Sequence, residues 1–263
     1  PGGGPSAETE TWNGTNWTEV NDMNTGRYAL AGAGTKTAAL AMGGAAPSPS
    51  ALVEQWNGTN WTEVGDLNQS RRGLGASGSS PSSLAVAFAG QYGSPVTRTG
   101  VTELWNGTSW TETTDMSTAR SHVASGGTYP SAFVAGGESP AKSNTEEWTA
   151  AGAAVGAWST GNAANTARAY SGASTAGTQN ASIIFAGYTG TAYTGATESY
   201  DGTSWTEVND MNTGRSASAG AGTSTSALDF GGNDGSDRGY TESFNGTNWT
   251  EVNDMNSGRR ELA

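Results

Sequence analysis

The chain has 263 residues, no Cys, one His and a formal net charge of −12. Without Cys it has neither a disulfide framework nor a thiolate metal site, and a single His excludes a His-rich metal site. The acidic balance argues against nucleic acid and anionic membrane surfaces as partners, and no apolar run approaches the roughly 18 residues of a spanning helix.

The predicted elements are short strands, each bounded by Gly, Asn, Asp or Ser. The chain begins with two strands, at 8–12 and 17–20. A strand of small residues follows at 28–34, then an apolar strand ending in Gly at 38–44, an alternating strand at 51–56, and a Trp-Thr-Glu-Val strand at 61–64. The same four segment types then recur, with apolar strands at 83–90, 132–137, 182–187 and 227–232, small-residue strands at 122–127 and 216–222, and an alternating strand at 101–105. No stretch shows helical periodicity, so we expect almost no helix.

Asn-Gly or Asp-Gly joins the third strand to the fourth in most units, as at Asn13-Gly14 and Asp201-Gly202. These residues tolerate positive φ and predict tight hairpin turns. The Asn-Gly-Thr tripeptides of these turns match the N-glycosylation pattern, and so do the Asn-Trp-Thr tripeptides at Asn16, Asn60 and Asn248. We prefer the turn interpretation because the hairpins need these residues in any case.

An arginine follows a tryptophan by ten residues in six places, and successive arginines are 44 to 49 residues apart. A fixed internal offset with variable spacing indicates one supersecondary unit copied around a repeat architecture. Four antiparallel strands per unit favour the blades of a β-propeller, in which radial repetition protects the sheet edges. We therefore predict one all-β domain over 1–263, a six-bladed β-propeller. Its unit boundaries lie near Arg27, Arg71, Arg120, Arg168, Arg215 and Arg259.

The two ends of the chain are complementary parts of one unit. It starts with a third and a fourth strand, and residues 260–263 begin a first strand. Six units at the mean spacing need about 278 residues, about 15 more than the chain has. We expect five complete blades and a sixth that is shared between the termini and lacks an inner strand. Edge pairing with a neighbouring chain is one way to fill that place.

The repeat resembles the kelch type. Gly43-Gly44 end a second strand, Trp56 ends a third, Trp61 opens a fourth, and Leu67 and Arg71 precede the next unit. The corresponding residues in another unit are Gly231-Gly232, Phe244, Trp249, Met255 and Arg259. Two units depart from the pattern, with Ala89-Gly90 and Ala186-Gly187 in place of the glycine pair, and Ala164 stands where other units have Met or Leu. The Asn-, Thr- and Gly-rich copies are also similar to repeat proteins of environmental bacteriophages and bacterial surface proteins.

Few residues suit catalysis. His122 is the only histidine, and we expect a packed or channel-facing residue there rather than a catalyst. We therefore predict no enzyme activity, no catalytic residues, no metal site and no cofactor. The copper-radical oxidases of the kelch type need a Cys, Tyr and His ligand set that this chain lacks.

Most carboxylates recur with the repeat. We expect a structural ring of the six arginines with Asp22, Asp66, Asp115, Asp210 and Asp254, in which the aspartates make turn hydrogen bonds or pair with arginine. The alternative is a ring of weak Ca²⁺ sites, since hard oxygen ligands suit that ion.

The loops between second and third strands differ most among the units, and loops on a rigid scaffold commonly carry function. We expect them to share a face with the Asp and Arg turns. Their candidate binding residues are Tyr92, Arg98, Tyr188, Tyr193, Asp234, Asp237 and Arg238. Tyrosines beside Asn and Asp suit sugar binding. The alternative is that these are exposed loop residues that bind no ligand.

We expect a non-enzymatic structural or adhesion module, extracellular or virion-associated, as in a phage tail fibre or a surface protein. Its partner would be a cell-surface glycan or protein receptor, or other copies in the same assembly as a homo-oligomer. Nucleic acid and membrane insertion are not expected. The alternatives are an intracellular kelch-like scaffold for protein interaction and a glycan-active enzyme.

Overall fold

The strands are built from small, β-branched and aromatic residues, as their burial requires. The computed structural model describes residues 4–77, 82–138, 140–150 and 156–262, and these residues contain strands and turns but no helix. In the second strand of a unit both faces are covered, so that all of Ala85–Phe88 is buried. In the fourth strand Trp110 is buried, while the Thr and Glu that follow it are exposed. The described residues therefore contain no helix that could cross a membrane.

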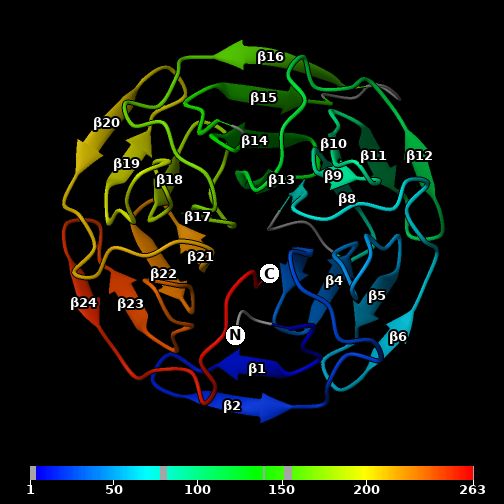
Figure 1. The fold of residues 1–263 in the computed structure, drawn as a ribbon, viewed down its shortest axis with the longest axis horizontal. Coiled ribbons are helices and arrows are strands. Elements are labelled where there is room, and N and C mark those ends of the chain that lie inside the picture. The colour runs from blue at the N-terminus through cyan, green and yellow to red at the C-terminus, as the bar shows by residue number, and fades with distance from the viewer. Residues whose placement is uncertain (1–3, 78–81, 139, 151–155, 263) are drawn as a thin grey trace.

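Five four-stranded antiparallel sheets surround a central axis as the blades of a β-propeller (Figure 1). Within each blade the strands follow one another from the axis to the rim, and neighbouring blades touch through their innermost strands. The first blade contains β3 (Ala31–Thr35), β4 (Ala38–Met42), β5 (Val53–Trp56) and β6 (Trp61–Glu63). The second contains β7 (Gly75–Ala76), β8 (Ala85–Phe88), β11 (Thr102–Trp105) and β12 (Trp110–Glu112).

The remaining three blades repeat this order. The third contains β13 (Ala124–Thr128), β14 (Ser131–Ala135), β15 (Thr145–Thr149) and β16 (Ala157–Gly161). The fourth contains β17 (Gly172–Ala173), β18 (Ser182–Phe185), β19 (Thr197–Tyr200) and β20 (Trp205–Val208). The fifth contains β21 (Ala219–Thr223), β22 (Ser226–Phe230), β23 (Thr241–Phe244) and β24 (Trp249–Glu251).

The predicted count of six blades is wrong, because the structure has five. Between the fifth blade and the first lies a two-stranded sheet of β1 (Thr9–Trp12) and β2 (Trp17–Val20). We call this region the two-stranded sector (Figure 1). The physical reason is that residues 260–262, which were expected to begin a first strand, form no strand pairing, and Ala263 lies outside the described residues.

The core lies between the blades. Each hydrophobic cluster combines residues from adjacent sheets, as where Leu40 and Met42 of the first blade join Trp105 and Trp110 of the second. Trp105 and Trp110 are cross-strand partners with ring centroids 5.3 Å apart. Aromatic side chains bury roughly 150–250 Å² each. Paired aromatics therefore supply the core that the small residues of the inner strands do not.

Indole hydrogen bonds join neighbouring sheets around the ring. In five of the six units the fourth-strand Trp donates its Nε1–H to a Thr Oγ1 at the start of the preceding sheet's third strand. These bonds, 2.9 to 3.1 Å long, are Trp17 to Thr241, Trp61 to Thr9, Trp158 to Thr102, Trp205 to Thr145 and Trp249 to Thr197. In the remaining unit Val53 takes the Thr position, and Trp110 donates to the Gly65 carbonyl instead. The bond from Trp17 to Thr241 attaches the two-stranded sector to the fifth blade.

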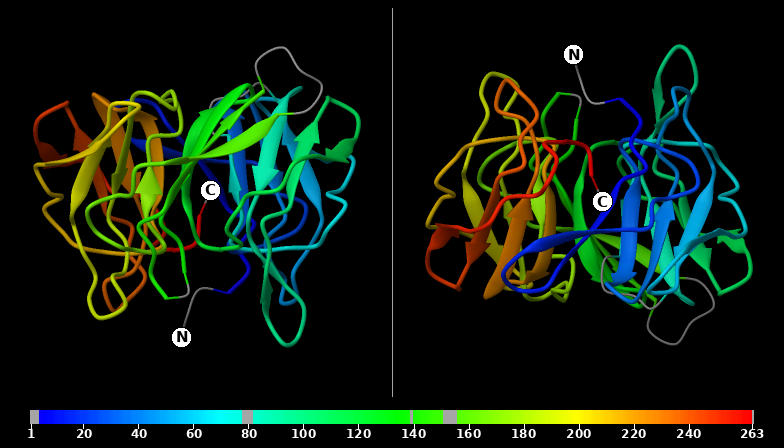
Figure 2. Two further views of the ribbon diagram at one scale, coloured as in Figure 1. Left: turned by 90° about the horizontal axis from the view of Figure 1, so that it is seen from above. Right: turned by 90° about the horizontal axis from the view of Figure 1, so that it is seen from below.

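One face of the ring carries the loops between second and third strands, and we call it the loop face. The longest of these loops forms a small hairpin of β9 (Gln91–Tyr92) and β10 (Thr97–Arg98). Figure 2 shows this hairpin projecting from the edge-on ring. The turns between first and second strands, such as the one at Tyr129, lie on the opposite face.

Candidate functional site

Each repeat arginine extends into the sheet that follows it, and all of them except the part-buried Arg259 are buried there. Arg71 is fully buried, with Nη2 2.9 Å from Glu103 Oε1 and Nη1 donating to the carbonyls of Ala89 and Val101. Glu103 also accepts bonds from the backbone N–H and the side-chain amide of Asn68. The glutamate therefore joins the arginine to the turn that enters the blade.

The same pairing recurs in every unit. The pairs are Arg27–Glu54, Arg71–Glu103, Arg120–Glu146, Arg168–Glu198, Arg215–Glu242 and Arg259–Glu10. Burial lowers the pKa of Arg27, Arg71, Arg120 and Arg168, and the paired glutamates oppose that effect. Their guanidinium groups stay charged in the interior, since arginine does not deprotonate in proteins.

The periodic aspartates lie apart from these pairs, and all five are exposed. Oδ1 of Asp115, Asp210 and Asp254 accepts the backbone N–H of Thr102, Thr197 and Thr241, respectively, at 3.1 to 3.2 Å. The structural contribution of these three aspartates is thus to fix the start of the third strand in their units. The arginine partners are instead the third-strand glutamates, which sequence reasoning missed although they recur two residues before each aromatic.

Six backbone hydrogen bonds form a closed ring around the axis. Each links the residues two positions after successive arginines, in the order Ala29, Gly73, His122, Tyr170, Ala217 and Glu261, at 2.7 to 3.0 Å. All six residues have positive φ, between 52° and 60°. Glu261 closes this ring by accepting from Ala29 and donating to Ala217. Glycine suits this left-handed conformation best, and His122, Tyr170 and Glu261 are the larger side chains that adopt it in this ring.

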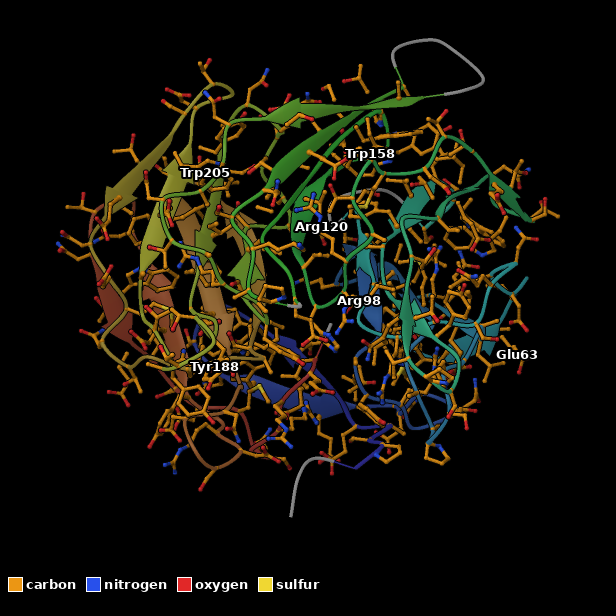
Figure 3. The ribbon with its side chains drawn as sticks, turned by 45° about the horizontal axis from the view of Figure 1, so that its top comes forward. Glu63, Arg98, Arg120, Trp158, Tyr188 and Trp205 are labelled. Atoms are coloured by element: carbon orange, nitrogen blue, oxygen red, sulfur yellow. The ribbon has the colours of Figure 1, made fainter. Side chains whose placement is uncertain are left out.

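His122 and Tyr170 belong to a polar cluster around Glu138. His122 Nδ1 lies 2.9 Å from Glu138 Oε1, and the Tyr170 hydroxyl donates to Glu138 Oε2 at 2.8 Å. The imidazole and phenol rings pack against each other at 4.3 Å. Arg98 adds an ion pair to Glu138 at 3.5 Å. Figure 3 shows Arg98 near the middle of the ring, whereas Glu63 lies at its rim.

The cluster stabilises the negative charge of Glu138. Burial by itself would raise the pKa of this carboxyl, but the hydrogen bonds and charge of His122, the Tyr170 hydroxyl and Arg98 outweigh burial and hold the pKa at about 2. Burial and the nearby Glu138 charge raise the pKa of Tyr170. The cluster therefore holds Glu138 as a carboxylate and Tyr170 as a hydrogen-bond donor.

An axial cavity of about 130 Å³ adjoins this ring of backbone hydrogen bonds. It is lined by the innermost strands and by His122, Tyr170 and Glu261. Ligand pockets for small molecules usually measure about 300–1,000 Å³. The axial cavity is thus too small for a sugar unit or a nucleotide, and a ligand would have to bind over its mouth.

Five of the predicted binding residues are brought together beside the fourth and fifth blades. The rings of Tyr188 and Tyr193 lie 5.6 Å apart, and the Tyr193 hydroxyl donates to Asn233 Oδ1 at 2.9 Å. Asn233 in turn donates to Asp237. Arg238 donates to Asp234 at 2.8 Å and lies over the Tyr240 ring at 5.2 Å. Tyr193 is 41% exposed and presents the most accessible aromatic ring of this group.

The other two predicted residues lie in the β9–β10 hairpin. Arg98 joins the Glu138 cluster, whereas Tyr92 is half-buried opposite Thr97. Sequence reasoning missed Glu138 and Tyr170. Both could have been noticed in the sequence. Glu138 is the acidic residue directly after the Gly pair of its unit, and Tyr170 is a bulky residue two positions after the repeat arginine. No group of three or more His, Asp or Glu suited to a metal ion occurs in the part of the chain that the structure describes.

No protein-family model and no curated protein matches the chain. Among solved structures, one described as the structure of YjhT is similar, with a TM-score of 0.68 and 11% sequence identity. The similarity covers 95% of this chain and 93% of that one. At so low an identity the likeness shows the β-propeller fold alone.

Proposed function

We propose that this chain is a non-enzymatic binding module, extracellular or virion-associated, that recognises a cell-surface glycan or protein through its loop face. The observation that carries the proposal is the placement of its irregular residues. The repeat fills the blades with near-identical strands, and the polar and aromatic exceptions gather on one face around the axis. Loops held by a rigid scaffold are a common location for binding residues.

The group at Tyr193 favours a glycan as the ligand. An accessible tyrosine ring gives an apolar surface for a sugar ring, and its hydroxyl is already oriented by Asn233. Asn233, Asp237 and Arg238 add donors and acceptors within the same loops.

The glycan version is tested on an array of cell-surface glycans with the 263-residue chain and three variants. Tyr193→Ala and Tyr188→Ala should each weaken the best binder by roughly tenfold, as expected for loss of an aromatic anchor. Tyr129→Ala, on the opposite face, is the matched control and should leave binding unchanged. Equal losses in all three variants, or no glycan bound at all, would remove the glycan version of the loop-face proposal.

The second candidate is an intracellular kelch-type scaffold for protein interaction. It is favoured by the glycine pairs that end second strands at positive φ, as at Gly43 and Gly44. Capture of a defined soluble partner by the wild-type chain and not by the Arg98→Ala variant would support it. Hydrolysis of a polysaccharide by the purified chain would instead favour the glycan-active enzyme.

A further inference from the structure

Four Asn-Gly turns join third strands to fourth strands on the face opposite the loop face. Their asparagines are Asn13, Asn57, Asn106 and Asn245, and all four are exposed. The sequence contains no other Asn-Gly pair. In each turn the asparagine Oδ1 accepts the backbone N–H groups of the residues two and three positions later, at 2.8 to 2.9 Å. The four carboxamides are therefore held in one common orientation at the surface.

The turn leaves two nitrogen atoms of each pair without a firm partner. In the turn between β23 and β24, neither Asn245 Nδ2 nor the Gly246 N–H has a hydrogen-bond partner among the described residues. Asn106 Nδ2 makes only a long bond of 3.4 Å, to Ser109 Oγ. Gly246 is exposed at a φ of 92°, and it has no Cβ to shield its nitrogen. The amide that can leave and the nitrogen that can attack are thus both accessible to water.

We propose that the four Asn-Gly turns are modification sites, at which water converts the side-chain amide into a carboxylate. The glycine nitrogen attacks Cγ of the asparagine, so that a Cγ–N bond forms and the Cγ–Nδ2 bond breaks. The glycine N–H proton leaves with Nδ2 as ammonia. Water then adds to a carbonyl carbon of the cyclic imide and opens it, which restores a backbone amide and produces a carboxylate. The sum is one water consumed and one ammonia released, with no change of oxidation state.

The fourth blade shows that such a turn accommodates the product. Asp201-Gly202 stands at the same place there, and Asp201 Oδ1 accepts the Thr203 and Ser204 N–H groups at 2.8 and 2.7 Å. The bonds from Ser204 and Thr203 lower the pKa of Asp201, so the turn favours the ionised carboxylate. Hydrogen bonds to a charged acceptor are also stronger than those to a neutral amide. Conversion of asparagine to aspartate therefore preserves the turn and its hydrogen bonds.

The asparagines that follow the fourth strands lie in the opposite environment. Asn212 donates its backbone N–H and its Nδ2 to Glu242 Oε2, at 2.8 and 2.9 Å, and Nδ2 also donates to the Trp249 carbonyl at 3.2 Å. Asn24 and Asn68 are held in the same way. An aspartate at these positions would place a carboxylate against a buried glutamate, and like charges so close disfavour each other. The structure thus separates asparagines that can change from those that must not.

The modification would alter one face of the molecule only. Each conversion adds a negative charge to the face opposite the loop face, in a chain whose formal net charge is already −12. A Cβ at Gly58 would lie 3.4 Å from the Thr37 carbonyl oxygen, which places the Asn57 turn beside the turn between β3 and β4 on that face. The candidate binding residues of the loop face are left unchanged.

Peptide mapping by mass spectrometry tests the assignment on the 263-residue chain, incubated in its folded state at mildly alkaline pH. The mass increase from amide to acid should accumulate at the four Asn-Gly turns and be lost at Asn24, Asn68 and Asn212. The variant Gly246→Ala should stop conversion at Asn245, because the added methyl group hinders attack by the nitrogen. The other three turns of the same variant are its internal controls and should convert as in the wild type.

Two further variants test the product without waiting for the reaction. Asn245→Asp should change the unfolding equilibrium constant by no more than about threefold, as expected at an exposed position. Asn212→Asp, packed against the same blade, should raise it by roughly tenfold or more, because it loses hydrogen bonds to Glu242 and adds a like charge. Three results would overturn the proposal: no acid formed at the turns, equal conversion at Asn212 and Asn245, or equal destabilisation by the two aspartates.

Discussion

At the scale of single residues, the ring depends on buried charges that are fully paired. Glu103 accepts three hydrogen bonds, and the other third-strand glutamates resemble it in their arginine and turn partners. Desolvating an ion pair is costly, but removing one partner costs more because it leaves an uncompensated charge inside the protein. The arginine and glutamate of each unit are therefore required together.

The variant Glu103→Gln should lower the free energy of unfolding by about 3–5 kcal/mol, because it leaves buried Arg71 without its counter-charge. Chemical denaturation measures the change. Glu112→Gln, at an exposed position in the fourth strand of the same blade, is the control and should cost about 0–0.5 kcal/mol. Similar stabilities for the two variants would contradict the role assigned to the pair.

Asp229 is an exception, because it adds a second carboxylate beside Arg215 where the first two blades have Ala41 and Ala87. Burial raises its pKa to about 6, against the attraction of Arg215. A carboxyl with a raised pKa in the folded state binds more protons there than in the unfolded state, so its contribution to stability falls as the pH rises from about 4 to 6.

We therefore expect Asp229→Ala to become more stable relative to the wild type as the pH rises through this window. The relative gain should reach about 3 kcal/mol at pH 7, from roughly 2 units of pKa shift. Denaturation of both proteins at pH 4, 5, 6 and 7 measures the difference. A difference that is independent of pH would show that the pKa of Asp229 is not raised in the folded protein.

At the scale of elements, each sheet is held to the preceding one by an aromatic side chain. The fourth-strand Trp spans the interface between sheets and donates to a Thr hydroxyl, as Trp249 does to Thr197 at 3.1 Å. Both groups are buried, so an indole N–H without its acceptor would carry a desolvation cost. One unit has Val53 in place of this Thr, and there Trp110 donates to the Gly65 carbonyl instead.

Thr197→Val should cost about 1–3 kcal/mol, since it leaves the Trp249 N–H unpaired at almost constant side-chain volume. The control is Thr206→Val in β20, where the side chain is exposed. Thermal unfolding followed by near-ultraviolet circular dichroism measures both. Equal midpoints would mean that Trp249 finds another acceptor, as Trp110 does.

The strands themselves were largely predictable, because their pattern is local. The apolar segment predicted at 38–44 forms β4 and ends in Gly43 and Gly44 at positive φ, and the segment at 182–187 forms β18. The contacts of the candidate binding residues were harder to predict. Tyr188 and Tyr193 could be selected from unequal loops, but Glu138 acquires its role only from contacts with His122, Tyr170 and Arg98, which lie far from it in the sequence.

At the scale of the whole molecule, the two ends of the chain meet through specific contacts. Arg259 donates to Glu10 and Glu8, and Trp17 donates to Thr241. Glu261 completes the ring of backbone hydrogen bonds around the axis. These contacts span more than 200 residues of sequence. Closing so long a loop costs conformational entropy, which only contacts formed by the complete ring can offset.

Arg259→Ala should lower the free energy of unfolding by about 2–3 kcal/mol, because it removes charge-assisted hydrogen bonds to a nearly buried Glu10. Arg260→Ala is the neighbouring control. Its ion pair with Asp237 is 3.5 Å long and part-exposed, and it should contribute about 0–1 kcal/mol. Urea denaturation distinguishes the two, and an equal effect would show that closure does not depend on Arg259.

The sequence by itself determined the all-β class, the strands and their order in each unit, and the radial repetition, because these follow from local patterns and from spacing that recurs along the chain. Tertiary structure alone decided which groups meet. It paired the arginines with third-strand glutamates, gathered His122, Tyr170 and Glu138 around the axis, and paired β1 with β2 alone among the described residues, where a sixth blade was expected. The physical reason is that these contacts join residues brought together only when the ring closes, and no local pattern encodes that geometry.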